Sequence, residues 1–352
     1  MAMSLKEGSI YFLRERDYLS GEISPYVKIG LVRDNKPTEE RIAEHQTGNP
    51  RQILDYETLE SPFVEYLETQ LHYRFASRWI SGEWFLLDQE GLRSAVNEAK
   101  SLISEFRHQE ETIVHSMELS KKSSTAAERE PNEKERSIWE ELCKIKLRKD
   151  ELEARKIVLK SKLSNKLSAA GSIEGVIRVM ANAPTPSFDV KLLAEAHPEI
   201  YQSYLNLKKT ALSGSFSIRG KKQLKAENLS LYEAKNDATK QIKQLRFQDS
   251  KDSIERDNEI EKLHAEYIDI QHDLYTNDWE LQALEAQLKV FVGETEGLVG
   301  LCGWKRTMQT KTVFNQSLFK SERADLYEEF SVTRQPTVAV SINTWRPYHF
   351  KT

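Results

Sequence analysis

The sequence is poor in cysteine and contains no long hydrophobic run. Its only 2 cysteines, Cys143 and Cys302, stand far apart and outside any CxxC or Cys/His spacing. This argues against a disulfide framework and a structural zinc site, and favours a reducing compartment. No apolar stretch reaches the roughly 18 residues of a membrane span, and Met1 to Gly8 lacks the apolar run of a signal peptide. We therefore expect a cytoplasmic protein without membrane contact.

A large excess of charge of one sign is also lacking. The chain has 51 Lys and Arg against 55 Asp and Glu, and hydrophobic residues make up 39% of it. This balance is typical of a globular protein and does not by itself indicate a nucleic-acid binder. At 352 residues the chain exceeds the size of most single hydrophobic cores, so more than one domain is expected.

Composition and periodicity divide the chain into four segments. Residues 1–106 alternate strand-like apolar runs with short helical stretches, which predicts a compact α+β domain. Residues 107–132 are rich in Glu, Ser, Lys and Thr and predict a linker. Residues 133–219 and 220–352 each predict a long helix followed by a small α/β module, so the C-terminal region should be mainly helical.

Both long helices carry apolar residues at heptad spacing. The first series is Ile138, Ile145, Leu152 and Leu159, and the second is Ile260, Tyr267, Leu274, Leu281 and Leu288. Such a seam predicts helix packing of the coiled-coil type. Two arrangements fit: an antiparallel hairpin within one chain, or a parallel coiled coil that joins two copies or a partner protein.

The segments after the two helices resemble each other. A glycine pair, Gly171 and Gly175, follows the first helix, and Gly293 and Gly297 follow the second. Further on, Phe188 and Tyr201 have the same mutual spacing as Phe314 and Tyr327. We interpret this as two repeated modules and a pseudo-symmetric duplication. Chance similarity is the alternative.

Five short motifs occur in a fixed order in the first hundred residues. They are Gly8-Ser-Ile-Tyr11, Val27-Lys-Ile-Gly30, Arg41-Ile-Ala-Glu-His45, Leu67-Glu68-Thr-Gln-Leu71-His72 and Gly82-Glu-Trp-Phe85. Together they resemble the GIY-YIG nuclease superfamily, in the branch common in phage and mobile-element proteins. The resemblance implies a small antiparallel sheet flanked by helices and an endonuclease that hydrolyses phosphodiester bonds with a divalent metal, Mg²⁺ or Mn²⁺.

The resemblance suggests roles for four residues, and a fifth, Lys28, departs from the family pattern. Glu68 would hold the metal, because Mg²⁺ prefers hard oxygen ligands. Arg41 would bind the scissile phosphate through its planar fork. Tyr11 would orient or deprotonate the attacking water, and His45, on the helical face of Arg41, would act as general base. Lys28 departs from the family, where many members carry a tyrosine, and so leaves the identity of the general base open.

Every one of these residues also has a purely structural interpretation. Tyr11 could be a core tyrosine, Glu68 an exposed helix charge, and Arg41 an ion-pair partner of Glu44 or Glu40. It is the preserved order of all the motifs that favours catalysis. We expect His72, Trp84 and Phe85 to serve packing rather than chemistry.

The N-terminal segment is poorly suited to hold a polyanion alone. Residues 6–105 contain 12 Lys and Arg against 18 Asp and Glu. A basic stripe between residues 208 and 246 could compensate, and its proposed nucleic-acid-binding members are Lys208, Lys209, Arg219, Lys221, Lys222 and Lys225. The alternative is a solvated surface.

The sequence thus predicts a DNA endonuclease, with RNA not excluded as substrate, that acts in phage biology or in defence against phage. The run from Gly293 to Tyr327 is also similar to the tail that follows the catalytic core of YqaJ-type viral exonucleases. One alternative is a nucleic-acid-binding protein that keeps the nuclease fold and has lost turnover. Another is an assembly protein whose coiled-coil segments recruit a partner.

Overall fold

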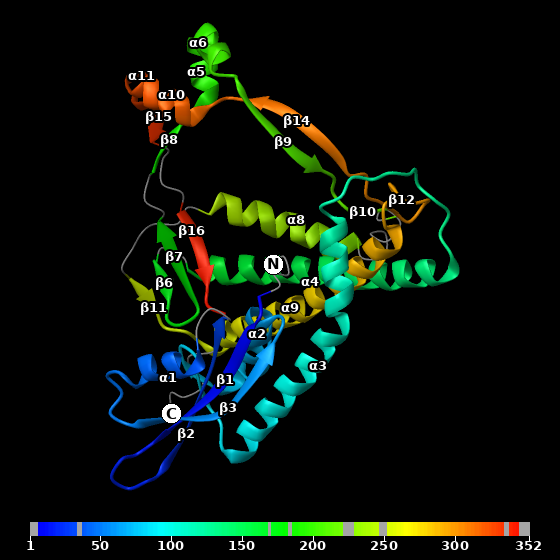
Figure 1. The fold of residues 1–352 in the computed structure, drawn as a ribbon. Coiled ribbons are helices and arrows are strands. Elements are labelled where there is room, and N and C mark those ends of the chain that lie inside the picture. Colours follow the sequence, from blue (N-terminus) through cyan, green and yellow to red (C-terminus); the bar gives the residue numbers. More distant parts are fainter. Residues whose placement is uncertain are drawn as a thin grey trace.

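A computed structural model shows a mixed α+β unit packed against a long helical body (Figure 1). It describes residues 6–33, 37–167, 170–181, 185–220, 229–245, 252–333 and 338–344. No helix in these ranges has the length and apolar character needed to cross a membrane.

The N-terminal unit is an antiparallel sheet of five strands in the order β3-β1-β2-β5-β4. Its strands are β1 (Gly8–Arg16), β2 (Ile23–Arg33), β3 (Gln52–Ser61), β4 (Trp79–Ser81) and β5 (Trp84–Leu86). Its helices are α1 (Thr38–Gln46), α2 (Val64–Arg74), the short η1 (Ala76–Arg78) and α3 (Gln89–Leu119). The expected antiparallel sheet flanked by helices is confirmed.

Strand β1, which lies between β3 and β2, is buried on both faces, and its side chains divide between two clusters. Ile10 and Phe12 pack in the main core with α2 and α3. Tyr11 and Leu13 belong to a second cluster, together with Ile42 of α1. Successive side chains of a strand point to opposite faces, so Tyr11 lies on the face that α1 covers.

Helix α3 runs into the segment that the sequence predicts as a linker. It ends only at Leu119, so the linker prediction is wrong for residues 107–119. The cause is a buried stripe on one face of the helix, because Ile113, Ser116 and Leu119 recur at spacings of three and are buried. Within the predicted linker, only residues 120–132 are not helical.

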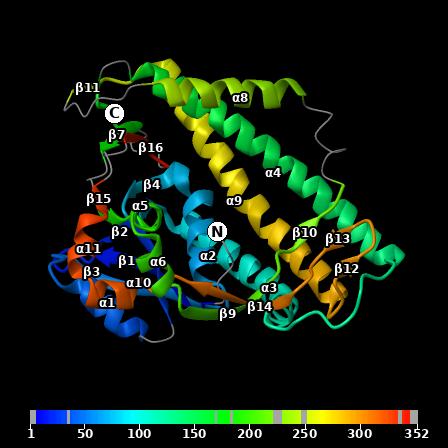
Figure 2. The same ribbon diagram turned by 90° about the horizontal axis from the view of Figure 1, so that it is seen from above.

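The helical body is built on an antiparallel pair, α4 (Glu133–Lys166) and α9 (Asn258–Val292), with α8 (Leu229–Gln244) against α4. Lys166 near the end of α4 pairs with Glu259 at the start of α9 (2.6 Å). Lys149 pairs with Asp278 farther along (2.7 Å). These contacts make the pair an intrachain antiparallel hairpin (Figure 2). The parallel coiled coil concerns a second chain and stays a prediction.

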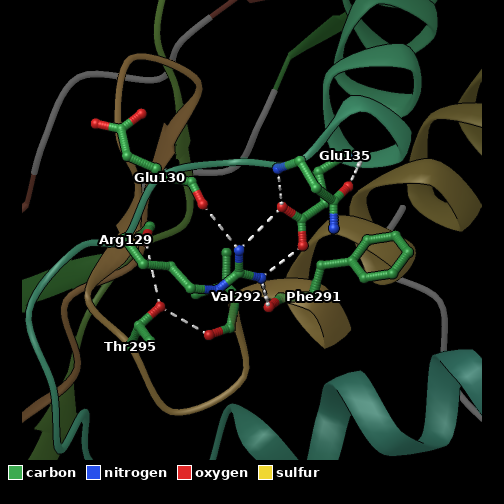
Figure 3. Close-up of polar contacts among 8 residues, drawn as sticks. Arg129, Glu130, Glu135, Phe291, Val292 and Thr295 are labelled. Atoms are coloured by element: carbon green, nitrogen blue, oxygen red, sulfur yellow. Dashed lines mark hydrogen bonds and ion pairs between the residues drawn. The ribbon is translucent and has the colours of Figure 1, made fainter.

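A network around Arg129 joins the start of α4 to the end of α9 (Figure 3). The guanidinium donates to both carboxylate oxygens of Glu135, at 3.0 and 2.5 Å, and to the Phe291 carbonyl at 2.8 Å. Glu135 also accepts from the backbone N–H of Asn132, whose side chain accepts from the Glu135 N–H, which is a capping box. The hydrogen bonds from Arg129 hold the pKa of Glu135 below its usual value.

The segments that follow α4 and α9 share one order of elements. After α4 come β6 (Ser172–Ile173), β7 (Ile177–Ala181), β8 (Pro186–Phe188), α5 (Val190–Ala196), α6 (Pro198–Ser203), β9 (Leu207–Ser213) and β10 (Ser217–Ile218), with β11 (Ser253–Ile254) before α9. After α9 come β12 (Gly297–Leu298), β13 (Cys302–Gly303), β14 (Thr307–Val313), α10 (Gln316–Glu322), α11 (Ala324–Glu329), β15 (Ser331–Thr333) and β16 (Val338–Ile342).

The two segments also pair with each other. Strand β9 pairs with β14, β8 with β15, β7 with β16, and β10 with β13. The turns of the short hairpins lie at Gly175 (φ 70°) and Gly300 (φ 75°). The structural counterpart of Gly175 is therefore Gly300, which lies three residues after Gly297, the counterpart expected from the sequence. Duplication as the origin of the two segments stays a prediction.

The hairpin supports the N-terminal unit through aromatic contacts. Trp279 of α9 lies 4.3 Å from Phe106 of α3 between ring centroids. Tyr66 of α2 stacks on Tyr275 at 4.6 Å and donates to the Tyr275 backbone carbonyl at 2.6 Å. Helix α9 therefore completes the core beneath α2, the helix that carries Glu68.

Candidate active site

Tyr11 reaches the site across a glycine. In the register of β1 and β2, Tyr11 lies directly opposite Gly30. A Cβ atom at position 30 would lie 2.4 Å from the Tyr11 hydroxyl oxygen and 2.7 Å from Cζ, which no real contact allows. Gly30 is therefore needed for the Tyr11 ring to lie over β2.

The Tyr11 hydroxyl makes a hydrogen bond with His45 Nε2 at 3.0 Å. Burial raises the pKa of Tyr11 to about 12, with Glu83 adding to the rise and Arg41 opposing it. Burial, followed by the nearby charges of Lys28 and Arg41, lowers the pKa of His45. Near neutral pH the tyrosine hydroxyl is therefore protonated, and the imidazole is neutral and able to accept a proton.

Lys28 is buried and paired. Its ammonium group lies 2.5 Å from a carboxylate oxygen of Glu83 and 5.9 Å from the centre of the Trp84 ring. The residue is only 8% exposed. Lys28 thus supplies a fixed positive charge beside the site, held by Glu83.

Glu83 is the site residue that the sequence reasoning missed. It pairs with Lys28, and its charge affects the pKa of Tyr11, His45 and Glu68. The motif Gly82-Glu-Trp-Phe85 contains this carboxylate, but its place in the motif order alone gives the glutamate no role.

Glu68 lies on α2, near enough to Glu83 and Lys28 for their charges to affect its pKa. Burial raises its pKa to about 7, and the negative charge of Glu83 adds to the rise, while Lys28 and Arg33 oppose it. In the described part of the chain, no three His, Cys, Asp or Glu residues are arranged to hold a metal. Carboxylates completed by water are nevertheless a donor set that suits Mg²⁺ or Mn²⁺, and Glu68 and Glu83 are the candidates to supply them.

Arg41 lies at the open side of the group. Its guanidinium pairs with Glu44 at 2.9 Å on the same helix, as the structural interpretation expected, and its side chain is 38% exposed. It is also close enough to the Tyr11 hydroxyl to affect the pKa of that group. Exposed ion pairs of this spacing are weak, so an anionic ligand can displace Glu44.

The residues expected to serve packing are buried or partly buried. His72 donates from Nε2 to the Ile29 carbonyl at 2.7 Å, which holds α2 against β2. Phe85 is fully buried in the main core. Trp84 is partly buried against the cluster of Tyr11 and Leu13.

The basic stripe is divided by the fold. Lys208 and Lys209 lie exposed on β9, whereas Arg219 is engaged with the Glu128 carboxylate. Lys221, Lys222 and Lys225 lie outside the described residues.

The N-terminal unit has a counterpart among known families. Residues 8–106 match the family model of the T5orf172 domain, and the match ends before the segment that resembles the YqaJ tail. Comparisons with curated proteins and with solved structures give no significant match. The T5orf172 domain is phage-associated and found in endonuclease contexts of the GIY-YIG and HNH kinds. All the candidate site residues on β1, β2, α1, α2 and the turn before β5 therefore lie within the part of the chain that matches this family model.

Proposed function

We propose that the protein is a GIY-YIG-type endonuclease that hydrolyses phosphodiester bonds in DNA with Mg²⁺ or Mn²⁺. The observation that carries the proposal is the hydrogen bond of 3.0 Å between Tyr11 and His45, with Glu68 and Arg41 in the same charged group. The phage association of the matched domain favours a role in phage biology or in defence against phage.

His45 is the proposed general base. Its neutral imidazole accepts a proton from the attacking water, directly or through the Tyr11 hydroxyl. Tyr11 orients that water and does not ionise, because a pKa of about 12 keeps its hydroxyl protonated near neutral pH. The two residues thus divide the functions of proton acceptor and orienting group.

Glu68 would hold the divalent ion, with Glu83 near it. When bound, such an ion neutralises charge on the phosphate and lowers the pKa of water. Arg41 binds a non-bridging phosphate oxygen after releasing Glu44, and its fork fixes the orientation of that phosphate. Lys28, held by Glu83, adds a second positive charge that a phosphodiester approaching the site would meet.

A plasmid assay tests the proposal. Purified protein is incubated with supercoiled DNA in Mg²⁺, in Mn²⁺ and in EDTA, beside the variant Glu68→Gln, which keeps the size of the side chain and removes its charge. We expect nicked or linear product only with metal and only from the unaltered chain. Linear, branched and single-stranded DNA and an RNA substrate, assayed in parallel, define the preference.

Two results would overturn the proposal. Product formed in EDTA, or equally by Glu68→Gln, would remove the metal and its ligand from the reaction. No cleavage of any substrate, together with tight binding of DNA, would support the nucleic-acid-binding protein without turnover.

A further inference from the structure

The ribbon of strands β9 and β14 has both faces open to solvent. The strands pair antiparallel from Leu207 opposite Val313 to Ser213 opposite Thr307. At least four consecutive residues in the middle of each strand are exposed. Figures 1 and 2 show the ribbon as an arc between the end of the α4 and α9 hairpin and the small helices α5, α6, α10 and α11.

The ribbon is fixed at both ends and is therefore not a loose arm. At its base, Arg306 is 1% exposed, stacks on Trp304 at 3.7 Å, and donates to the backbone carbonyls of Leu119 and Gly293. At its far end, the backbone N–H of Asn315 donates to the Tyr204 carbonyl at 2.8 Å. A two-stranded ribbon without a core is only marginally stable in water, so these anchors give it a defined position.

The charge of the ribbon is entirely positive. Its strands contain Lys208, Lys209 and Lys311, and neither strand has an acidic residue. Lys209 and Lys311 are register partners, so their side chains leave the same face side by side. Like charges directly opposite each other destabilise a strand pair, and a bound anion relieves that repulsion.

The polar uncharged residues of the ribbon are suited to the same kind of partner. Thr310 and Thr210 are partners on the other face, where their hydroxyls join at 2.8 Å. Gln309 and Thr312 add exposed polar side chains on β14. Hydroxyl, amide and ammonium groups are those that contact phosphates and base edges in nucleic acids.

We infer that the β9–β14 ribbon is a docking surface for duplex DNA, with Lys209 and Lys311 as its phosphate contacts. This inference rests on the proposed function for its biological sense. The B-form major groove admits a two-stranded ribbon, whereas the A-form major groove of RNA is too narrow for side-chain reading. The acidic N-terminal segment makes a separate basic surface necessary for holding a polyanion.

The test is binding of the full chain to a fluorescent DNA duplex in EDTA at several salt concentrations. The variant is Lys209→Gln with Lys311→Gln. Its matched control is Lys144→Gln with Lys262→Gln, which removes two exposed lysines from the surfaces of α4 and α9. Lys209→Arg with Lys311→Arg keeps the charges and reports on folding of the ribbon.

We expect the ribbon variant to bind duplex DNA about tenfold more weakly at low salt. The slope of log affinity against log salt should fall by about 2, one for each lost phosphate contact. The control and the arginine variant should bind as the unaltered chain does, and duplex RNA of the same sequence should bind more weakly than DNA.

Several outcomes would overturn the inference. They are an unchanged affinity and slope in the ribbon variant, an equal loss in the control, a loss in the arginine variant that equals the glutamine loss, and a preference for duplex RNA. Because binding is measured without metal, it is independent of cleavage. A chain that binds through the ribbon but never cuts contradicts only the proposed function, and one that cuts but ignores the ribbon changes contradicts only this inference.

Discussion

The ring of Tyr11 fills the space that any side chain at position 30 would need, because Gly30 is its direct partner on β2. Gly30→Ala must therefore displace the Tyr11 hydroxyl from His45. We expect cleavage to fall about 10²-fold or more. Gly91→Ala is the control, since a Cβ there meets its nearest atom at 3.2 Å, a side-chain oxygen of Asp88. Plasmid cleavage rates, with thermal unfolding to verify folding, provide the measurement.

Tyr11→Phe separates the hydroxyl from the ring. The ring keeps its packing, so the unfolding midpoint should change little, while cleavage should drop by about 10²–10⁴-fold. A variant that cuts at the rate of the unaltered chain would reduce Tyr11 to a core residue.

The raised pKa of Glu68 determines the direction in which the stability of the folded chain changes with pH. Its carboxyl ionises at about 7 in the folded chain, against an ordinary value of 4.5. Ionisation therefore opposes folding increasingly as the pH rises through this window, and the cost is absent below it. Glu68→Gln, measured without metal, should be more stable than the unaltered chain at about pH 8 and equally stable at about pH 4.

The cleavage rate should also depend on the ionisation of Glu68, but it should rise with pH where stability falls. Metal binding needs the carboxylate, so at limiting metal the rate should fall as the pH drops below about 7 and recover with excess metal. A rate that declines equally at saturating metal would assign the dependence to another group, with His45 the first to examine.

Arg41 is expected to act through the shape of its side chain. Arg41→Lys retains the charge and loses the planar fork, so the cleavage rate should fall about 10²-fold while DNA affinity changes little. Glu44→Gln, which removes only the partner of Arg41, should leave the rate near that of the unaltered chain. Parallel losses of affinity and rate in Arg41→Lys would make this residue a docking contact.

The N-terminal fold was predictable because its signals are local. The alternation of strands with short helices in residues 1–106 appears in the structure as expected, and the motifs lie on these elements. Glu83 was missed because its role depends on a distance of 2.5 Å to Lys28, and the two residues are 55 positions apart. The prediction of a linker failed at residues 107–119 because their composition is polar overall, although one face of α3 is buried.

The C-terminal region was harder to predict because its strands pair with partners that are distant in the chain. Lys311 lies outside the basic stripe of residues 208–246, and only the register of β9 and β14 brings it opposite Lys209. Charge counted along the sequence cannot reveal such a pair. The heptad spacing predicted the two long helices. Their antiparallel direction is evident only from contacts in the structure, such as that between Lys149 and Asp278.

The dependence of the N-terminal unit on α9 leads to the last prediction. Trp279 lies in the main core of that unit, 4.3 Å from Phe106 and 5.5 Å from Phe63 between ring centroids. Trp279→Ala should lower the free energy of unfolding by about 3–5 kcal/mol, because the cavity lies between two parts of the chain that cannot close on it fully. Hydrogen exchange is the measurement, since it reports on α2 separately. The amides of Val64–Arg74 should lose protection in Trp279→Ala and keep it in Trp139→Ala, where the lost ring packs with Leu142 in a separate core cluster near the start of α4. If α2 exchanges equally in both variants, residues 1–106 form an independent domain, as the sequence alone suggests, and α9 only rests against it.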